Sequence, residues 1–461
     1  MRKILLLILI ILISSCSQPK EDNSDSPIRD IPQDKETVTS FIGSDGDVYR
    51  INITTYNKEF PYHNELFTPA TLNITEQDTS IILKNDTDIE MRIRGNSTRE
   101  PDKKAFRIKF SEAQSLFGLK KAKDWVLLAN YFDKTNIRNY LAYRLANKLD
   151  NLDFQPSSIF VELYLNDEYE GLYMLTEQIE ANKGRVDIEK DFNSQGISSF
   201  LIEADWRAIS EYPDMEGKCY FRLENYALKF KYPNCNKYLE AILYKDQYFI
   251  NQYEKNIRWA KDFFTIAMNA VKANDFDRFS EYINVPSFID YYLVEEFFKN
   301  LDVGQTSQFY FIKQTASPKI TAGPVWDFDL SAGVVATDSY DLYRNTPLFA
   351  RYIDSFYSYL FKNETFLQMV KERYTETREL FVEVFDDFSQ IKKDLTLSQE
   401  RNVQRWPYPF DKTNWIENYA ISDEYYALRS LEAHYNHLAN FLQQRLVLLD
   451  NEYLIESNKG I

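Results

Sequence analysis

At residues 323–331 the chain reads Gly-Pro-Val-Trp-Asp-Phe-Asp-Leu-Ser, directly after a strand-like apolar run. Asp327 and Asp329 alternate there with large apolar side chains. On extended backbone, alternate side chains point to the same side, so this stretch predicts two converging carboxylates beside an apolar core. Acids held next to a core need a cation, and Mg²⁺ (or Mn²⁺) prefers such oxygen ligands. The alternative is a turn whose two acids are both solvated.

The preceding segment, residues 295–312, contains a third candidate acid. A helical pattern ends near Asn300, Asp302 begins a loop, and an apolar strand follows. An acid in this position is able to orient an attacking hydroxyl group or to accept its proton. Gln308, further along, offers a carbonyl oxygen to a metal ion. The alternative is that Asp302 only caps or connects the loop.

A basic turn lies in the N-terminal half. Residues 94–98 read Arg-Gly-Asn-Ser-Thr, and residues 103–109 read Lys-Lys-Ala-Phe-Arg-Ile-Lys. A turn with glycine and hydroxyl groups offers backbone N–H groups to phosphate oxygens, and a lysine on the strand neutralises them. A hairpin with a solvated basic rim is the alternative.

The apolar pattern divides the chain into a β-rich half and a helical half. Period-two alternation from residue 38 to about residue 110 predicts an antiparallel sheet. The other expected elements are a capped helix over 133–146, a hairpin of 160–165 and 171–177 around Asn166-Asp167, strands at 200–203 and 228–232, and a short hairpin within 309–326 of an otherwise helical second half. The predicted fold is therefore α+β. Its predicted parts are a β-rich N-terminal lobe with one early helix over 38–247, a mainly helical C-terminal lobe over 248–455, and a tail over 456–461.

Taken together, these segments resemble the spore-coat protein H (CotH) kinase family over roughly residues 38–453. The resemblance rests on the order of several motifs: 94–98 with 103–109, Trp125 with Asp133 and Arg138-Asn139, Gly171-Leu172-Tyr173 with 176–179, and 323–329. It implies a two-lobed, atypical protein-kinase-like fold. It also implies transfer of phosphate from ATP to protein serine with the help of a divalent metal.

The resemblance implies roles for single residues as well. Asp327 is similar to the metal-binding acid of kinases, with Asp329 close by, and Asp302 is similar to the catalytic-loop acid. Lys104 is expected to reach the α- and β-phosphates, with Lys109 as the second choice.

Other residues would bind the nucleotide or the metal. Arg94 and Asn96 would lie near the phosphates. Gln308 stands where a metal-binding Asn is expected, and its longer side chain makes it a looser ligand. The position of the kinase hinge, which presents backbone groups to adenine, corresponds to Glu177, Gln178 and Ile179.

The N-terminus has the pattern of an exported lipoprotein. Residues 1–15 combine two basic residues with a short apolar run that ends in Ser14-Ser15, directly before Cys16. The run is too short for a membrane-spanning helix and is typical of a cleaved signal peptide. Lipidation of Cys16 would anchor the chain, and the polar, acidic residues 16–37 read as a flexible tether. We expect a place in a bacterial cell envelope, at the outer membrane, with exposure on the cell surface as a further option; an ordinary secreted protein is the alternative.

Composition excludes several classes of function. The formal charge is −16 and becomes −18 when Arg2 and Lys3 leave with the signal peptide, so nucleic acid is not an expected partner. The chain has only three histidines, which excludes a histidine-centred triad or a zinc cage. Cys219 and Cys235 are free to form a disulfide in an exported protein or to remain thiols.

Three functions remain open. The first is an envelope-anchored kinase that transfers the ATP γ-phosphate to protein Ser/Thr hydroxyls. The second is an inactive kinase-like scaffold that binds a protein or surface ligand of unknown identity. The third is a transferase with a sugar or lipid hydroxyl as acceptor.

Overall fold

The computed structural model describes residues 41–335, 347–408 and 421–455. The predicted signal peptide, Cys16, the tether and the 456–461 tail lie outside these residues, so their expected roles stay predictions. Among the described helices, none combines the length and apolar character that a membrane crossing requires.

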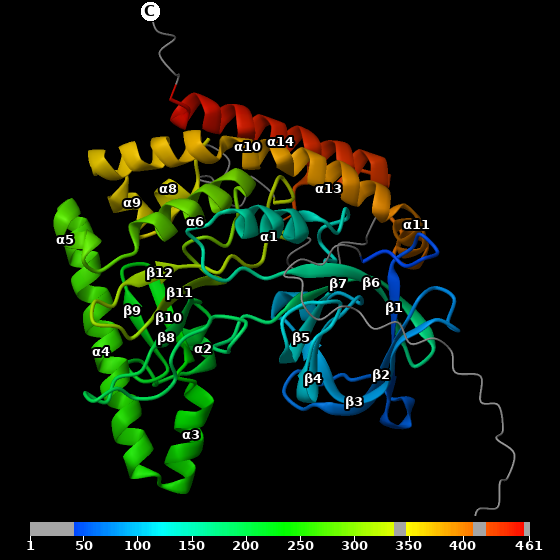
Figure 1. Cartoon of the computed structure of the whole chain (residues 1–461), viewed down its shortest axis with the longest axis horizontal. Coiled ribbons are helices and arrows are strands. Elements are labelled where there is room, and N and C mark those ends of the chain that lie inside the picture. The colour runs from blue at the N-terminus through cyan, green and yellow to red at the C-terminus, as the bar shows by residue number, and fades with distance from the viewer. Residues whose placement is uncertain (1–40, 336–346, 409–420, 456–461) are drawn as a thin grey trace, which may run out of the picture.

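The N-terminal part is a closed barrel of seven strands (Figure 1). Neighbouring strands are antiparallel except for the β1–β6 pair, which is parallel. In barrel order the strands are β1 (Tyr49–Thr55), β2 (Thr68–Thr75), β3 (Ile82–Arg94), β4 (Ala105–Gln114), β5 (Ala122–Leu128), β7 (Glu168–Glu177) and β6 (Ser158–Leu165). Alternate residues such as Met91, Ile93, Phe106 and Ile108 are fully or almost fully buried, as the period-two pattern requires.

The predicted hairpin of β6 and β7 is confirmed. Asn166 and Asp167 form its turn with φ values of 55° and 72°, a left-handed pair that suits a two-residue loop. Further along β7, Gly171 has a φ of 118°, and a Cβ there would come within 2.8 Å of Asn402 Oδ1. The Gly171 motif therefore lets α11 (Thr396–Arg405) pack directly on the strand.

A second, five-stranded antiparallel sheet follows. Its order is β12 (Ile320–Ala322), β11 (Gln308–Ile312), β8 (Phe200–Ala204), β10 (Tyr226–Tyr232) and β9 (Tyr220–Leu223). The strands predicted at 200–203 and 228–232 and the hairpin within 309–326 are therefore confirmed. Strands from both sides of residue 247, the predicted lobe boundary, pair in this sheet because β11 lies beside β8.

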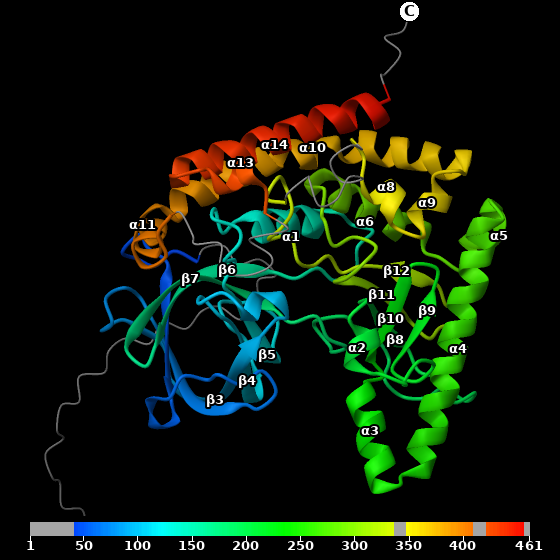
Figure 2. The same cartoon turned by 180° about the vertical axis from the view of Figure 1, so that it is seen from behind.

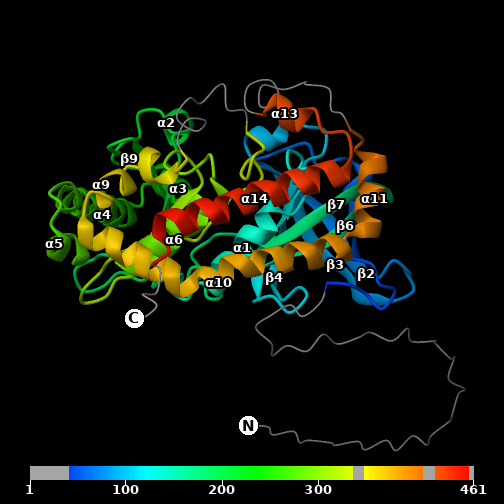
Figure 3. The ribbon, with the colours of Figure 1, turned by 90° about the horizontal axis from the view of Figure 1, so that it is seen from above.

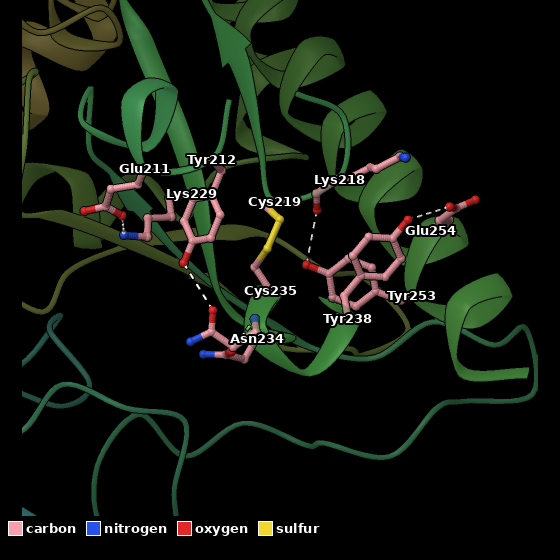
Figure 4. Close-up of a disulfide and its surroundings, with 11 residues drawn as sticks. Glu211, Tyr212, Lys218, Cys219, Lys229, Asn234, Cys235, Tyr238, Tyr253 and Glu254 are labelled. Carbon is pink, nitrogen blue, oxygen red and sulfur yellow. Dashed lines mark hydrogen bonds and ion pairs between the residues drawn. A yellow bond between two sulfur atoms is a disulfide. The ribbon is translucent and has the colours of Figure 1, made fainter. Parts of the chain in front are cut away.

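A disulfide joins Cys219 to Cys235 (Figure 4). It resolves the alternative that the sequence left open. The bridge ties the residue before β9 to the first residue of α3 (Cys235–Tyr244), next to the short helix α2 (Ala208–Glu211).

A layer of helices covers one side of both sheets, and other helices lie beside the second sheet (Figure 2). The long helices α10 (Glu364–Asp394) and α14 (Leu431–Tyr453) run side by side, and both pack on α6 (Val285–Phe298). Figure 3 shows the pair from above, with α1 (Arg138–Lys148) beneath it. Every residue of α6 except Pro286 is buried, so this helix lies in the centre of the helical part.

The remaining described helices are the long helix α4 and four short helices. They are α4 (Gln247–Lys272), α5 (Phe276–Ser280), α8 (Ala350–Ile353), α9 (Tyr357–Leu360) and α13 (Asp423–Tyr426), with 3-10 turns η1 (Tyr56–Lys58) and η2 (Ser97–Arg99) in the barrel. The α+β class, with a β-rich N-terminal region and a helical C-terminal region, is confirmed.

The start of the early helix differs from the prediction. The sequence predicts a helix over 133–146, whereas α1 begins at Arg138. Asp133 accepts hydrogen bonds from the backbone N–H groups of Thr135 and Arg138, at 3.0 and 2.8 Å. These bonds stabilise a turn before the helix, which delays its first residue from 133 to Arg138.

Two histidines on α14 make stability sensitive to acid. His434 is 2% exposed and lies between the rings of Tyr408 and Tyr425, at 5.0 and 4.7 Å. Burial, with repulsion from Arg138 and Lys134, lowers its pKa from 6.5 to about 3, and burial lowers the pKa of His437 to about 4. The folded-state pKa lies below that of the unfolded chain, so the unfolded chain binds protons first.

We therefore predict a loss of stability as the pH falls from 6.5 towards 4. His434→Phe, which keeps a ring in place, should reduce this pH-dependent loss by about 1–3 kcal/mol. The measurement is chemical unfolding at several pH values. His63→Phe, at an exposed histidine of the barrel, is the control and should leave the pH profile unchanged. An unchanged profile in His434→Phe would contradict the prediction.

Candidate active site

A cleft of about 1500 Å³ lies between the barrel and the second sheet. The outer face of β3 and β4 forms one wall, because Arg92, Arg94 and Arg107 alternate there with the buried barrel residues. The opposite wall comes from β8, β10 and the residues around α2. The floor of the cleft contains the three predicted acids, Asp302, Asp327 and Asp329.

The three acids influence one another strongly. Burial raises the pKa of Asp302 well above its usual range, and the charge of Asp327 raises it further. Burial and the charge of Asp327 also raise the pKa of Asp329. The structure therefore brings together three acids, and burial and mutual repulsion disfavour the ionised forms of Asp302 and Asp329.

The backbone at Asp327 differs from the expectation. The sequence analysis placed both acids on extended backbone, but β12 ends at Ala322 and Asp327 has a φ of 71°. This left-handed residue turns the chain, so period-two geometry does not explain why the carboxylates face each other. Ser307 Oγ donates a hydrogen bond to Asp327 Oδ2 at 2.9 Å, which helps to orient that carboxylate.

Helix α1 holds the residues between the acids. The backbone N–H of Phe328 donates to Asn139 Oδ1 at 2.7 Å. Trp326 stacks on Tyr143 of the same helix, with ring centroids 5.7 Å apart. Because Asn139 and Tyr143 are one helical turn apart, together they hold Phe328 and Trp326 of the acidic segment.

A buried ion pair holds the segment after the acids. Arg138 and Asp133 pair with side chains that are both 0% exposed. The same guanidinium donates to the carbonyl oxygens of Ser331 and Ala332, each at 3.1 Å. Asp133 also contributes to the raised pKa of Asp329, after burial and Asp327. The pair therefore connects the start of α1 to the chain directly after Asp329.

Arginine side chains face the acids. Arg94 lies over the Trp326 ring at 5.5 Å; burial lowers its pKa, whereas Asp327 favours the charged form. Arg207 donates to Asp205 at 2.7 Å and also bonds to Thr306 in the loop after Asp302. With its amide oxygen turned towards this guanidinium, Asn96 accepts from Arg207 Nη1 at 2.8 Å. Arg207 therefore links the barrel turn to the acidic loop.

Six of the predicted residues line the cleft: Arg94, Asn96, Gln178, Asp302, Asp327 and Asp329. Lys104 and Lys109 are not among the described lining residues. Lys104 Nζ donates to the carbonyl oxygen of Arg99 at 2.6 Å, within its own turn, and Lys109 pairs with Glu90 at 3.6 Å. Arg94 thus stands closer to the acids than either lysine.

The remaining predicted residues are engaged within the fold. Gln308 Oε1 accepts from the Gly304 N–H at 2.8 Å, and Nε2 donates to Tyr310 and Asp354. Glu177 forms a buried ion pair with Arg185, and Ile179 is buried. These three residues are absent from the described cleft lining, so their proposed contacts with ligands would require a different arrangement.

No three His, Cys, Asp or Glu side chains of residues 41–335, 347–408 and 421–455 come together as a complete metal cage. Two acids of the floor fit Mg²⁺ nonetheless, because this ion is commonly held by one or two carboxylates together with water and phosphate oxygens. Burial and the charge of Asp327 disfavour the ionised forms of Asp302 and Asp329, and a cation would stabilise these forms; this is the local observation that favours a cation there.

A family model described as CotH kinase protein matches residues 91–449. The chain belongs to the CotH kinase family. The matched range includes the three acids, Arg94, Asn96, Asp133 and Arg138, and it begins within β3. No curated protein matches the sequence.

The sequence analysis of this CotH-family chain missed Arg207 and Arg92 as cleft residues. Arg207 follows β8 by three residues and has no motif around it, so only the pairing of β8 with β11 brings it to Asp302. Arg92 could have been predicted as a cleft residue, because it lies two residues before Arg94 on the same strand face.

The ion pair that holds the site can be tested on α1 itself. We predict that Arg138→Met destabilises the fold by about 3–5 kcal/mol, because it leaves Asp133 buried and unpaired and two carbonyl oxygens without their donor. Equilibrium unfolding in urea measures the loss.

Arg144→Met is the matched control on the same helix. Arg144 is 44% exposed and pairs with Asp387 at 2.8 Å, so its loss should cost about 1 kcal/mol or less. Equal, small effects of both substitutions would show that the buried pair does not support the site.

Proposed function

We propose that this protein is a metal-dependent phosphotransferase with a two-lobed kinase-like arrangement, which transfers the γ-phosphate of ATP to protein Ser/Thr hydroxyls. One observation carries the proposal: a single cleft has three mutually repelling acids on its floor and an arginine-lined wall beside them. Such a site suits a ligand that is itself a metal–polyphosphate complex, with negative phosphates and a bound cation.

The basic wall supports binding of phosphates. Burial lowers the pKa of Arg92, and repulsion from Arg107 and Arg94 lowers it further. Arg107 has a carboxylate partner in Asp124 at 2.7 Å, but the Nε of Arg92 has no hydrogen-bond partner among the described residues. A phosphate between these guanidinium groups would relieve their repulsion and supply acceptors for their donors.

The acids have separate roles in this proposal. Asp327 and Asp329 would hold Mg²⁺, which neutralises charge on the phosphates and orients them. Asp302 would accept the proton of the acceptor hydroxyl while its oxygen attacks the γ-phosphorus, and the bond to the β–γ bridging oxygen breaks to release ADP. The cation also favours the ionised form of Asp302, which burial alone disfavours.

An extracytoplasmic location is part of the proposal. The Cys219–Cys235 disulfide supports it, because such bonds persist mainly in oxidising compartments. Lipidation of Cys16 and a position at the outer membrane of a bacterial envelope extend the proposal from the sequence pattern alone.

The alternative is a catalytically inactive kinase-like scaffold that binds a surface ligand. It is favoured by the lack, among the described residues, of three side chains that could hold a metal on their own. The following test separates the two functions.

We predict that Mg²⁺ and ATP together raise the thermal stability of the protein, whereas either one alone has little effect. A ligand present at 100 times its Kd stabilises the native state by about 2.7 kcal/mol. Asp327→Ala should abolish the shift, and Asp302→Asn should keep the shift but lower phosphotransfer by about 100-fold or more.

Asp262→Ala, at an exposed carboxylate of α4, is the control and should behave like the wild type. Absence of a shift with every nucleotide tested would favour the inactive scaffold. A full shift in Asp327→Ala would contradict the assignment of the metal site.

A further inference from the structure

An exposed tryptophan stands beside the loop of Asp302. Trp206 is 55% exposed and lines the cleft, although large aromatic side chains are usually buried. Its backbone N–H donates to the carbonyl oxygen of Gln305 at 3.1 Å, and the Gln305 N–H donates to that of Asp302 at 3.0 Å. Two backbone hydrogen bonds therefore fix Trp206 to the acid that would receive the acceptor's proton.

Trp206 has an apolar neighbour one turn further on. Ile209 is 39% exposed, and its N–H donates to the carbonyl oxygen of Trp206 at 3.3 Å. Residues three positions apart lie on the same face of a helical turn. Trp206, which lines the cleft, and Ile209, which lies outside its described lining, thus form a small exposed apolar surface at the edge of the cleft, which we call the apolar lip.

The polar groups around the apolar lip are already paired. Arg207 binds Asp205 at 2.7 Å, and Lys229 lies 3.7 Å from Asp205 and also pairs with Glu211. A sugar ring needs hydrogen-bond partners for its hydroxyl groups as well as an aromatic face. The paired charges and the aliphatic Ile209 therefore favour an apolar side chain of a peptide over a sugar.

The cleft has room for such a segment. Its volume of about 1500 Å³ exceeds the range of about 300–1000 Å³ that is typical of small-molecule sites. A nucleotide held between the acids and the arginine wall would leave space next to Trp206.

The disulfide gives the apolar lip a rigid support. Figure 4 shows Cys219–Cys235 beside Tyr212, Lys229 and Glu211. Ala208 of α2 is fully buried in the same small apolar cluster as both cysteines, and Tyr212 packs against it. The short helix that follows Trp206 and contains Ile209 therefore packs on a segment in which the disulfide ties β9 to α3, so little order has to be gained on binding.

From these contacts we infer that the apolar lip selects the acceptor, by binding a large apolar side chain a few residues from the hydroxyl that is phosphorylated. This inference rests on the proposed phosphotransferase function. Trp206 is a specificity-determining residue in it and takes no part in the chemical step.

The test uses the purified full chain, Mg²⁺, labelled ATP and a library of serine-centred peptides. In each peptide one flanking position is fixed as Leu, Phe, Asp, Lys or Gly. At one position or more, Leu or Phe should raise kcat/KM about tenfold over Gly, mainly through KM. Trp206→Ala should reduce this preference to about twofold or less and should leave the thermal shift with Mg²⁺ and ATP unchanged.

Two further variants guard against a general loss of structure. Trp206→Phe retains an aromatic face and should keep most of the preference. Tyr244→Ala removes an aromatic side chain that is 79% exposed at the end of α3, outside the described cleft lining, and should have no effect.

The outcomes distinguish this inference from the proposed function. Phosphorylation without an apolar preference, or a preference that survives Trp206→Ala, overturns the inference and leaves the kinase function intact. A normal thermal shift with no phosphorylation of any peptide overturns the inference of a peptide acceptor. Loss of both the shift and the phosphorylation overturns the proposed function itself.

Discussion

The cleft depends on the buried ion pair between Asp133 and Arg138. Both side chains are removed from water, so the pair is stable only because each member has further partners. Asp133 receives backbone N–H groups at the start of α1, and Arg138 donates to the carbonyl oxygens of Ser331 and Ala332. The pair thereby fixes the helix and the acidic segment in one orientation. The next residue, Asn139, then reaches the backbone of Phe328 between the two acids.

This support explains how the protein keeps side chains of like charge close together. Three acids on the floor repel one another, and Arg92, Arg94 and Arg107 repel one another on the wall. Flexible side chains would move apart or bind opposite charges across the cleft. Arg207 binds Asp205 on its own side of the cleft, and α1 and the barrel strands hold most of the remaining groups apart. A site that keeps its charges separated before the ligand arrives requires little reorganisation when the ligand binds.

The sequence predicts the elements well and the site only in part. Alternation gives the strands of the barrel and the β6–β7 hairpin, because these patterns depend on local burial and turn residues. The three acids are recognisable from their apolar surroundings. The position of Lys104 is not, because its amine donates to the carbonyl oxygen of Arg99 in the same turn, a contact that no sequence pattern reveals. Arg207 and Trp206 reach the site through the pairing of β8 with β11, which no local pattern reveals.

The central claim is that the floor of the cleft holds a divalent cation together with a triphosphate. Electron paramagnetic resonance of Mn²⁺ tests it, because the signal of the free ion disappears on binding; the Mn²⁺–ATP complex without protein also loses this signal and is the reference from which binding to protein is measured. The account predicts tight Mn²⁺ binding when ATP is present, weak binding without nucleotide, and loss of the ATP-dependent binding in Asp327→Asn. Equal Mn²⁺ binding with and without ATP, or unchanged binding in Asp327→Asn, would contradict it.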